Sequence, residues 1–410
     1  MCPVFPIGSV QSEAKQCYNT QESSDSIVIH FLRNSGVNIS NNNKVELLTN
    51  GHDKFIDLFD HIRKAKHFVH LEYFNFRNDS IGNAIFKLLS EKTKEGVKVR
   101  VMFDAFGNWS NNKPLKNKQI KAIRKDSIEI VKFDPITFPY INHVFHRDHR
   151  KIAIIDGKTG YTGGMNVADY YIKGLPKIGQ WRDMHVRIEG NAVDDLEKIF
   201  LHMWNKETKQ NVSGKMYFPS HPAANDSSNI TVAIVDRTPE KTNRLIGRTY
   251  TTAINAAQHQ VRIVNPYFVP ASAINKSLKK CAERNVDVEI MISLKSDIPF
   301  TPDAAMYKVH KLMKKGAKIY LYDNGFQHSK IMMVDGSFCT VGSTNLDNRS
   351  LRYDYEANAF IFNKQITKQL NDIFDNDIKN SIQLTPEYWK KRSPWKKFAG
   401  WFANLFTPFL

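Results

Sequence analysis

One segment of the chain occurs twice, and this duplication constrains the fold more than any other feature. Residues 149–166 read HRKIAIIDGKTGYTGGMN, and residues 328–345 read HSKIMMVDGSFCTVGSTN. The two segments align without a gap, and both fit the pattern H-x-K-x4-D-x6-G-[GS]-x-N. An internal repeat of this kind indicates two copies of one structural unit. The chain has 410 residues, which is enough for two such units.

Regular elements precede each copy in the same order. Periodic apolar positions predict a strand, a helix, a strand, a helix and a strand in each half. The predicted ranges are 67–76, 81–96, 97–104, 118–126 and 128–133 in the first half, and 261–268, 274–285, 286–293, 302–316 and 318–323 in the second. This alternation of strands and helices predicts an α/β fold.

Residue composition divides the chain into five segments. The first segment is polar, and its end, NISNNNK at 38–44, is expected to form a loop. A stretch rich in Pro, Ser and Asn lies between the two halves and predicts a linker. The expected segments are a polar N-terminal segment at 1–43, a first lobe at 44–210, the linker at 211–229, a second lobe at 230–386 and a C-terminal tail at 387–410.

Each copy of the motif should present three polar side chains at one end of a strand. Residues i and i+2 of a strand share a face, so the histidine and the lysine point the same way. The glycines permit a tight turn that returns the asparagine to the same end. If the halves pack about a pseudo-twofold axis, both sets meet in one pocket. The sets are His149, Lys151 and Asn166 in the first half and His328, Lys330 and Asn345 in the second.

Two such sets suit phosphodiester chemistry. One imidazole can attack phosphorus and form a covalent phosphohistidine. The second can protonate the leaving oxygen, which departs opposite the nucleophile, and can then deprotonate an incoming alcohol. The lysines and asparagines can hold the non-bridging oxygens as charge builds on them. The chemistry calls for no metal or other cofactor, and the sequence has no carboxylate cluster with metal-ligand spacing.

Structural alternatives exist for these residues. A single histidine at the start of a strand is more often structural than catalytic, but duplication of the whole set argues against that interpretation. The aspartate of each copy, Asp156 or Asp335, either closes a turn or orients the site, and we include both in the expected catalytic set. The first copy has Gly164 where the second has Ser343. Only the second half therefore offers a hydroxyl group, which we expect to bind phosphate.

The paired motifs and their surroundings resemble bacterial cardiolipin synthases of the phospholipase D superfamily. The similar stretches are FHRDHRKIAIIDGKTGYTGGMNVADYY, QWRDMHVRIEG, RIVNPYFVP, SDIPFTPDAAMYK, GFQHSKIMMVDG and GSTNLDNRSL. The resemblance runs from about residue 44 to the C-terminus. It implies two pseudo-twofold-related lobes, each a mixed β-sheet flanked by helices, with the active site at the lobe interface. It also implies transfer of a phosphatidyl group between two phosphatidylglycerol molecules, with release of glycerol.

The resemblance implies roles for individual residues. It favours His149 as the nucleophile and His328 as the general acid and base. Asp183 in WRD and Glu356 in YDYEAN stand where the superfamily often has a carboxylate that bonds the catalytic imidazole and fixes its tautomer. Glu72 in HLEYF fits a residue that lines the pocket. Each of these three acids could instead be an ordinary surface, turn or strand-end residue.

The tail at 387–410 predicts a helix that binds a membrane surface. From residue 394 onward, aromatic residues recur at helical spacing, and lysines precede or interleave them. The alternative is a helix that docks on the protein's own core. The expected membrane-binding residues are Trp389, Trp395, Trp401, Lys396 and Lys397.

Charge and hydropathy bound the partners and the location. The formal net charge of +17 predicts an anionic partner. The first residues lack the features of a signal peptide, and no stretch approaches the roughly 18 apolar residues of a membrane-spanning helix, although family members often begin with two such helices. We therefore expect a peripheral protein on the cytoplasmic face of a bacterial inner membrane. Its expected partner is an anionic phospholipid membrane containing phosphatidylglycerol, not nucleic acid, and the oligomeric state stays open.

Other functions remain compatible with the sequence. A nuclease of the same superfamily would suit the basic charge and the phosphodiester chemistry. A hydrolytic phospholipase D, or a synthase that takes its phosphatidyl group from another lipid such as phosphatidylethanolamine, would use the same motifs. A membrane-binding protein with a decayed site is disfavoured because both motifs are intact.

Overall fold

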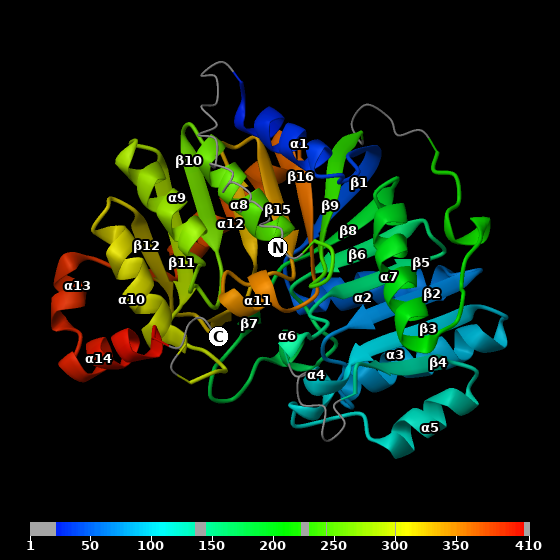
Figure 1. The fold of residues 1–410 in the computed structure, drawn as a ribbon. Coiled ribbons are helices and arrows are strands. Elements are labelled where there is room, and N and C mark those ends of the chain that lie inside the picture. Colours follow the sequence, from blue (N-terminus) through cyan, green and yellow to red (C-terminus); the bar gives the residue numbers. More distant parts are fainter. Residues whose placement is uncertain (1–21, 136–144, 223–228, 243, 300, 406–410) are drawn as a thin grey trace, which may run out of the picture.

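A computed structural model describes residues 22–135, 145–222, 229–242, 244–299 and 301–405. Within this part of the chain, a 15-stranded mixed sheet runs through the whole molecule, and helices cover both of its faces (Figure 1). No helix of the described part is long and apolar enough to cross a bilayer. Residues 1–21 of the N-terminal segment, 223–228 of the linker and 406–410 of the tail lie outside the described residues.

The first half supplies one side of this sheet. All five strands and helices predicted before the first motif are present. The elements are α1 (Ser24–Asn34), β1 (Ser40–Leu48), α2 (Gly51–Lys64), β2 (Phe68–Tyr73), α3 (Ser80–Lys94), β3 (Lys98–Asp104), α4 (Ala105–Trp109), α5 (Asn117–Lys125), β4 (Glu129–Phe133), β5 (Lys151–Ile155), β6 (Thr159–Gly163), α6 (Tyr170–Lys173), β7 (Trp181–Arg182), β8 (His185–Gly190) and α7 (Val193–Thr208).

The second half repeats the arrangement and adds a C-terminal extension. The five elements predicted before the second motif are also present. The elements are β9 (Ile230–Arg237), α8 (Leu245–Ala256), β10 (Gln260–Val264), α9 (Ser272–Glu283), β11 (Asp287–Ser293), α10 (Thr301–Met313), β12 (Lys318–Tyr322), β13 (Phe326–Gln327), β14 (Ile331–Val334), β15 (Phe338–Gly342), α11 (Asn348–Arg352), β16 (Glu356–Phe362), α12 (Lys364–Ile378), β17 (Ser381–Gln383), α13 (Pro386–Lys391) and α14 (Pro394–Ala403).

The strand order confirms the pseudo-twofold relation between the lobes. The first lobe runs β4-β3-β2-β5-β6-β8-β1 toward the centre, and the second runs β12-β11-β10-β14-β15-β16-β9, with β17 added at its outer edge. The central strands β1 and β9 pair antiparallel, so the two half-sheets are one sheet. A small separate sheet joins β7 of the first lobe to β13 of the second.

The motif strands are buried on both faces, which explains their apolar runs. Ile152 and Ile154 pack in a core layer that also holds α7 and α12 and continues into the second lobe. Ala153 and Ile155 face the opposite layer under α2 and α3. Both ends of β5 and β14 are therefore fixed relative to the core.

The expectation of a loop at 38–44 is wrong, because β1 already begins at Ser40. The polar side chains there are satisfied inside the sheet. The Asn43 amide donates to the carbonyl oxygens of Ser40 and Ile230, both at 3.0 Å. Asn42 has φ +65°, and the β1–β9 register shifts between Ser40 and Asn43. A β-bulge thus accommodates the asparagine run.

The described parts of the N-terminal segment and the linker are packed on the lobes. Helix α1 buries Val28 and Leu32 in the second lobe's core. In the linker, Lys215–Tyr217 forms one 3-10 turn. Tyr217 is buried there, and its hydroxyl accepts a hydrogen bond of 3.1 Å from Arg100.

The tail forms two helices that dock on α10. A Cβ at Gly400 would lie 2.5 Å from the carbonyl oxygen of Asp303, so the two backbones are in direct contact. Trp389 stacks on His310 with ring centroids 3.7 Å apart and packs against the second lobe's core. Its ring is thus partly engaged within the protein, and its expected role in membrane binding stays a prediction. Trp395 and Trp401 remain exposed, by 74% and 44%.

Candidate active site

Short backbone contacts between the lobes position the two motif histidines. The N–H of His149 donates to the carbonyl oxygen of Tyr355 at 3.0 Å. The N–H of His328 donates in the same way to Arg182 at 2.7 Å, where β13 runs parallel to β7. Each histidine therefore begins its strand against a residue of the opposite lobe.

The residue after each of these carbonyls supplies a carboxylate to the histidine. Glu356 follows Tyr355, and its Oε1 lies 2.9 Å from Nδ1 of His149. Asp183 follows Arg182, and its Oδ2 lies 2.6 Å from Nδ1 of His328. Both carboxylates are fully buried. Each bond holds the imidazole so that Nε2 is the nitrogen left for chemistry.

The motif lysines lie beside the histidines and share one electrostatic environment. Lys151 donates to the carbonyl oxygen of His149, and Lys330 donates to that of His328. Burial lowers the pKa of Lys151 to about 7 and that of Lys330 to about 8, against the opposing influence of Glu356 and Asp183. The Lys330 charge also lowers the pKa of Lys151 and of His149 in the other motif. Both sets of side chains therefore meet in one site.

The two imidazoles differ in their tendency to bind a proton. Burial, and then the Lys151 charge, hold the pKa of His149 well below its ordinary value. Burial and Lys330 also lower the pKa of His328, but the bonded Asp183 carboxylate opposes them. His149 is therefore the more strongly neutral ring of the pair.

The two asparagines are not equally engaged. Asn166 accepts from the N–H of Asn75 at 3.1 Å and donates to the Tyr171 hydroxyl at 3.3 Å. The Oδ1 atom of Asn345 is buried and has no hydrogen-bond partner in the described residues. The carboxamide oxygen of Asn345 is thus less tied to the surrounding protein than that of Asn166.

Ser343 does not face the site as a phosphate ligand, so that expectation is wrong. Its hydroxyl donates to Glu356 Oε2 and thereby fixes the carboxylate that holds His149. The equivalent Gly164 leaves room for the other acid: a Cβ there would lie 2.1 Å from Asp183 Oδ1. The serine and the glycine thus each suit the carboxylate beside them.

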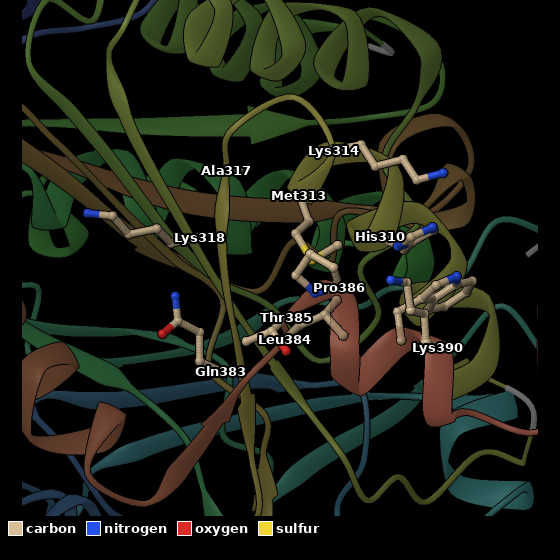
Figure 2. Close-up of a pocket in the computed structure, with 11 residues that line it drawn as sticks. His310, Met313, Lys314, Ala317, Lys318, Gln383, Leu384, Thr385, Pro386 and Lys390 are labelled. Carbon is tan, nitrogen blue, oxygen red and sulfur yellow. The ribbon is translucent and has the colours of Figure 1, made fainter.

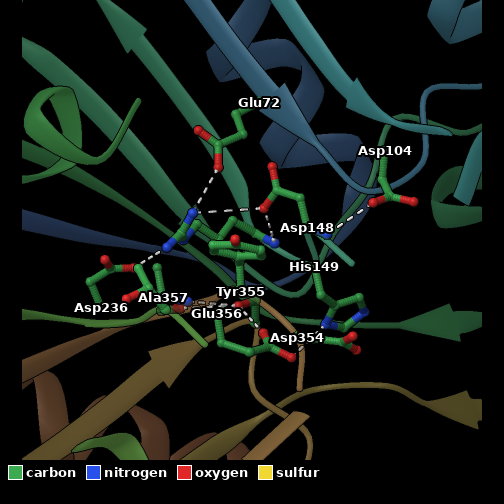
Figure 3. Close-up of polar contacts among 12 residues, drawn as sticks. Glu72, Asp104, Asp148, His149, Asp236, Asp354, Tyr355, Glu356 and Ala357 are labelled. Carbon is green, nitrogen blue, oxygen red and sulfur yellow. Dashed lines mark hydrogen bonds and ion pairs between the residues drawn. The ribbon is translucent and has the colours of Figure 1, made fainter. Parts of the chain in front are cut away.

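Glu72 does not line the pocket. It pairs across the sheet with Ile152, so it lies on the face opposite Lys151. There its carboxylate meets the buried guanidinium of Arg150 at 3.5 Å. Figure 3 shows Glu72 on the far side of this network, with Asp148 between it and His149. Burial, with the nearby Asp148, raises the pKa of Glu72 well above its usual range.

Asp156 and Asp335 close turns and do not belong to the catalytic set. Each lies at the end of its motif strand away from the histidine, with φ of +54° and +51°. The Asp156 carboxylate accepts from the backbone N–H groups of Lys66, His67 and Phe68 at 2.7–2.9 Å. Asp335 does the same for Gln258, His259 and Gln260. An Asp-Gly pair before a second strand is a hairpin signal, and it could have assigned both residues.

Lys54 is a charged residue near the site that the motif analysis missed. It lies in α2, fully buried, with its Nζ 4.0 Å from the Phe55 ring centroid and no hydrogen-bond partner in the described residues. Burial lowers the pKa of Lys54 to about 7, while the negative charge of Asp183 acts in the opposite direction. The signal was available, because Lys54 stands in the i, i+4 row of the buried Leu58 and Ile62.

Apart from the motifs, the described residues form a surface hollow but no metal-holding cluster of side chains. Among the described residues, no group of three or more His, Cys, Asp and Glu side chains is arranged to hold a metal ion. A hollow of about 590 Å³ lies between α10, β17 and α13, apart from the motif residues (Figure 2). Lys314, Lys318 and Lys390 are among its lining residues.

Comparison with known sequences agrees with this geometry. Residues 58–204 and 250–378 match the family described as "Cardiolipin synthase, PLD-like domain". A cardiolipin synthase of Listeria monocytogenes is 38% identical over 387 residues, which cover 94% of this chain and 79% of the relative. A cardiolipin synthase 2 of Staphylococcus epidermidis is 36% identical, with 93% and 77% covered.

Solved structures show a similar fold at low sequence identity. A phosphatidylserine synthase of Haemophilus influenzae superposes with a TM-score of 0.66 at 15% identity, covering 90% of this chain and 95% of the other. A polyphosphate kinase of Porphyromonas gingivalis gives a TM-score of 0.56 at 12% identity, covering 84% of this chain and 49% of the other. Both likenesses concern the fold alone.

Replacing Asp156, which closes a turn, should lower the free energy of unfolding and leave the turnover rate of the folded protein unchanged. Asp156→Ala removes the acceptor of three backbone N–H groups and places alanine at a positive φ, so we expect a loss of about 2–3 kcal/mol in the free energy of unfolding. Asp156→Asn, which tolerates this φ, should lose less. Urea denaturation measures both, with the exposed Asp126→Ala as control. A large fall in the lipid turnover rate of folded Asp156→Asn would restore the aspartate to the catalytic set.

Lys54 should make stability depend on pH in a defined direction. Between about pH 7 and 10.5, the unfolded chain retains a proton on Lys54 that the folded protein has released. This group therefore adds stability as pH rises, at up to about 1.4 kcal/mol per pH unit. Lys54→Met lacks that contribution, so its stability relative to wild type should be highest near neutral pH and fall toward pH of about 9. Urea denaturation across this range tests it, and the exposed Lys87→Met should differ from wild type by a constant amount.

Proposed function

This chain belongs to the cardiolipin synthase family of phospholipase D-like proteins, and we propose that it transfers a phosphatidyl group between two phosphatidylglycerol molecules through an intermediate on His149. The observation that carries the proposal is the pair of histidines in one site, each bonded through Nδ1 to a carboxylate of the opposite lobe. This arrangement leaves two imidazole Nε2 atoms for one phosphodiester.

His149 acts as the nucleophile in the first step. Its low pKa favours the neutral ring that attack requires. Glu356 accepts a hydrogen bond from the Nδ1–H group and stabilises the positive charge that develops on the ring. The Nε2 atom forms a bond to phosphorus, and the bond from phosphorus to the glycerol oxygen breaks. His328, whose protonated form the bonded Asp183 carboxylate favours, gives its Nε2 proton to the departing glycerol oxygen.

The second step reverses the direction of proton transfer. A hydroxyl of a second phosphatidylglycerol gives its proton to His328, and its oxygen bonds to phosphorus as the phosphorus–nitrogen bond breaks. The products are cardiolipin and free His149. Asp183 stabilises the charged form of His328 in both proton-transfer steps, because its carboxylate lies 2.6 Å from the Nδ1 atom of that ring.

The phosphate oxygens are held by Lys151 and Lys330, with Asn345 and Asn166 as amide donors. The ammonium groups of the two lysines donate to the histidine carbonyl oxygens. An anion between them offers a stronger partner, and its charge favours the protonated form of amines whose pKa burial has lowered. Binding and lysine protonation therefore support each other.

The tail is proposed to hold the enzyme on an anionic membrane as a peripheral protein, on the cytoplasmic face of the inner membrane. Helix α14 docks through Gly400, while Trp395 and Trp401 on other sides of the helix are exposed. Lysines Lys396 and Lys397 lie between these rings in the sequence. Each basic residue near an anionic surface contributes on the order of 1 kcal/mol to binding.

The reaction is tested with the purified protein and phosphatidylglycerol vesicles. We expect glycerol and cardiolipin to appear in equal amounts, and mass spectrometry measures both products. Phosphatidic acid as the sole lipid product would show a hydrolase. Cleavage of DNA without lipid turnover would show a nuclease and overturn the proposal.

The roles of the two histidines are tested by trapping the intermediate. His149→Ala should form no covalent adduct, because the attacking nitrogen is gone. His328→Ala keeps the nucleophile but lacks the proton donor, so turnover should fall at least about a thousandfold while some phosphatidyl-protein accumulates. Intact-protein mass spectrometry after rapid quenching distinguishes the two. An adduct found in His149→Ala and absent from His328→Ala would exchange the assigned roles.

The tail is tested with a double variant that leaves its docked side intact. Trp395→Ser with Trp401→Ser removes two exposed indoles, and the vesicle dissociation constant should rise about tenfold or more. Sedimentation with vesicles of phosphatidylglycerol and phosphatidylcholine measures it. Met216→Ser, which replaces an exposed apolar side chain of the linker, serves as control. Equal sedimentation of the double variant and wild type would contradict the proposed binding of the tail to the membrane.

A further inference from the structure

We propose that the whole edge of the molecule around the active-site mouth lies on the lipid bilayer, and that Trp109 and Phe145 of the first lobe and Ile298 of the second contact lipid together with α14. This inference rests on the proposed function, because it describes how bilayer lipid reaches that site. The three residues and the exposed side chains of α14 form what we term the mouth rim.

The first lobe places Trp109 at the edge that carries His149. Strand β2 runs parallel to β3 and antiparallel to β5, so the end of β3 and the start of β5 lie at one edge of the sheet. Helix α4 follows β3 directly and ends at Trp109, which is 75% exposed. Asp104, the N-cap of α4, also accepts from the N–H of Asp148 at 2.9 Å. The helix that carries Trp109 is thereby tied to the segment that carries His149.

The second lobe places Ile298 at the equivalent edge. Strand β11 is parallel to β10, and β10 is antiparallel to β14, so the end of β11 lies beside His328. Ile298 follows shortly after this end and is 48% exposed. Its neighbour Asp297 accepts a 2.5 Å hydrogen bond from Tyr267, whose ring lies 6.0 Å from the His328 ring. Ile298 is therefore one residue away from a wall of the active site.

Phe145 and α14 extend the same edge. Phe145 precedes the first motif, is 56% exposed, and has its ring centroid 6.2 Å from that of Tyr353 in the second lobe. Helix α14 meets the start of α10, where Asn404 donates to the carbonyl oxygen of Ala304 at 3.0 Å. Helix α10 begins three residues after Ile298. Figure 1 shows α14, α6 and α4 in the lower half of the molecule, with α6 and α4 near its centre and α14 at the far left.

Exposure of such side chains favours a bilayer as the partner. Among the described residues, most large hydrophobic side chains with high exposure belong to the mouth rim, to which α14 contributes Trp395, Phe398, Trp401 and Phe402. Leu405 follows α14 directly, whereas Ile56, Met216 and Ile382 lie elsewhere. Clustered exposed apolar side chains mark interaction surfaces. Trp in particular partitions to the membrane interface. The basic residues of α13 and α14 complement an anionic lipid surface in charge.

The chemistry gives the reason for this orientation. The reacting phosphodiester lies at headgroup level, while its acyl chains are held in the bilayer by about 0.8 kcal/mol per buried CH₂. A mouth that stood away from the surface would require the lipid to leave the bilayer. A mouth rim in contact with lipid brings the phosphate to His149 without that cost.

The decisive variant changes the first-lobe part of the mouth rim and leaves the tail intact. In Trp109→Ser with Phe145→Ser, we expect binding to vesicles of equal parts phosphatidylglycerol and phosphatidylcholine to weaken about tenfold, and turnover of vesicle phosphatidylglycerol to fall with it. Turnover of a short-chain phosphatidylglycerol, supplied as monomers below its critical micelle concentration, should match wild type. The matched control, Ile56→Ser with Met216→Ser, should behave as wild type in all three measurements.

The outcomes separate this inference from the proposed reaction. If the double variant binds vesicles as tightly as wild type, the first-lobe contact is wrong even when the enzyme makes cardiolipin. If wild type transfers no phosphatidyl group from either substrate but its vesicle binding still depends on Trp109 and Phe145, the docking surface stands and the proposed function fails. A change in oligomeric state by analytical ultracentrifugation, with unchanged vesicle binding, would assign the mouth rim to a second copy of the chain and overturn the proposal. Ile298→Ser provides an independent single variant on the second lobe, expected to weaken vesicle binding in the same direction.

Discussion

The active site depends on a backbone contact that neither lobe can make alone. The N–H of His149 bonds to the carbonyl of Tyr355, and the N–H of His328 bonds to that of Arg182. Because adjacent residues of an extended chain have side chains on fixed sides of the backbone, each contact also determines which acid reaches the imidazole. The lobe that supplies a histidine therefore obtains its carboxylate from the other lobe. The two histidine–carboxylate pairs therefore exist only in the joined structure.

Buried charges hold the same interface together. Arg150 of the first lobe pairs with Asp236 of the second, and the backbone N–H of Arg147 in the first lobe donates to the Asp354 carboxylate of the second at 3.2 Å. Buried ions are costly to remove from water and persist only when they are paired, so breaking one such pair typically costs about 3–5 kcal/mol. Glu72 belongs to this network and not to the pocket. Its position in β2 thus serves the contact with Arg150, through which it belongs to the network between the lobes.

The two copies of the motif have diverged around a common geometry. On the His149 side, the Ser343 hydroxyl holds the longer acid Glu356, and burial raises the pKa of that carboxyl. On the His328 side, Gly164 leaves space for the shorter Asp183, and the buried Lys54 lies within its electrostatic reach. Burial and Lys151 hold the pKa of His149 well below its ordinary value, whereas the bonded Asp183 opposes the lowering of the His328 pKa by burial and Lys330. Such a difference suits the roles proposed for His149 as nucleophile and His328 as proton donor.

The sequence by itself determined the repeat, the α/β class, the elements before each motif and the shared face of each histidine and lysine. These properties follow from local periodicity, since the i, i+2 spacing of a strand holds wherever the strand lies. It also indicated Asp183 and Glu356 as acids for the imidazoles, but only by resemblance. The tertiary structure decided that each acid crosses to the opposite lobe, that Asp156 and Asp335 close hairpins, that Glu72 faces Arg150, and that Trp389 stacks on His310. Those contacts join residues far apart in the chain, and their partners are set by how the two half-sheets meet along β1 and β9, which local spacing does not encode.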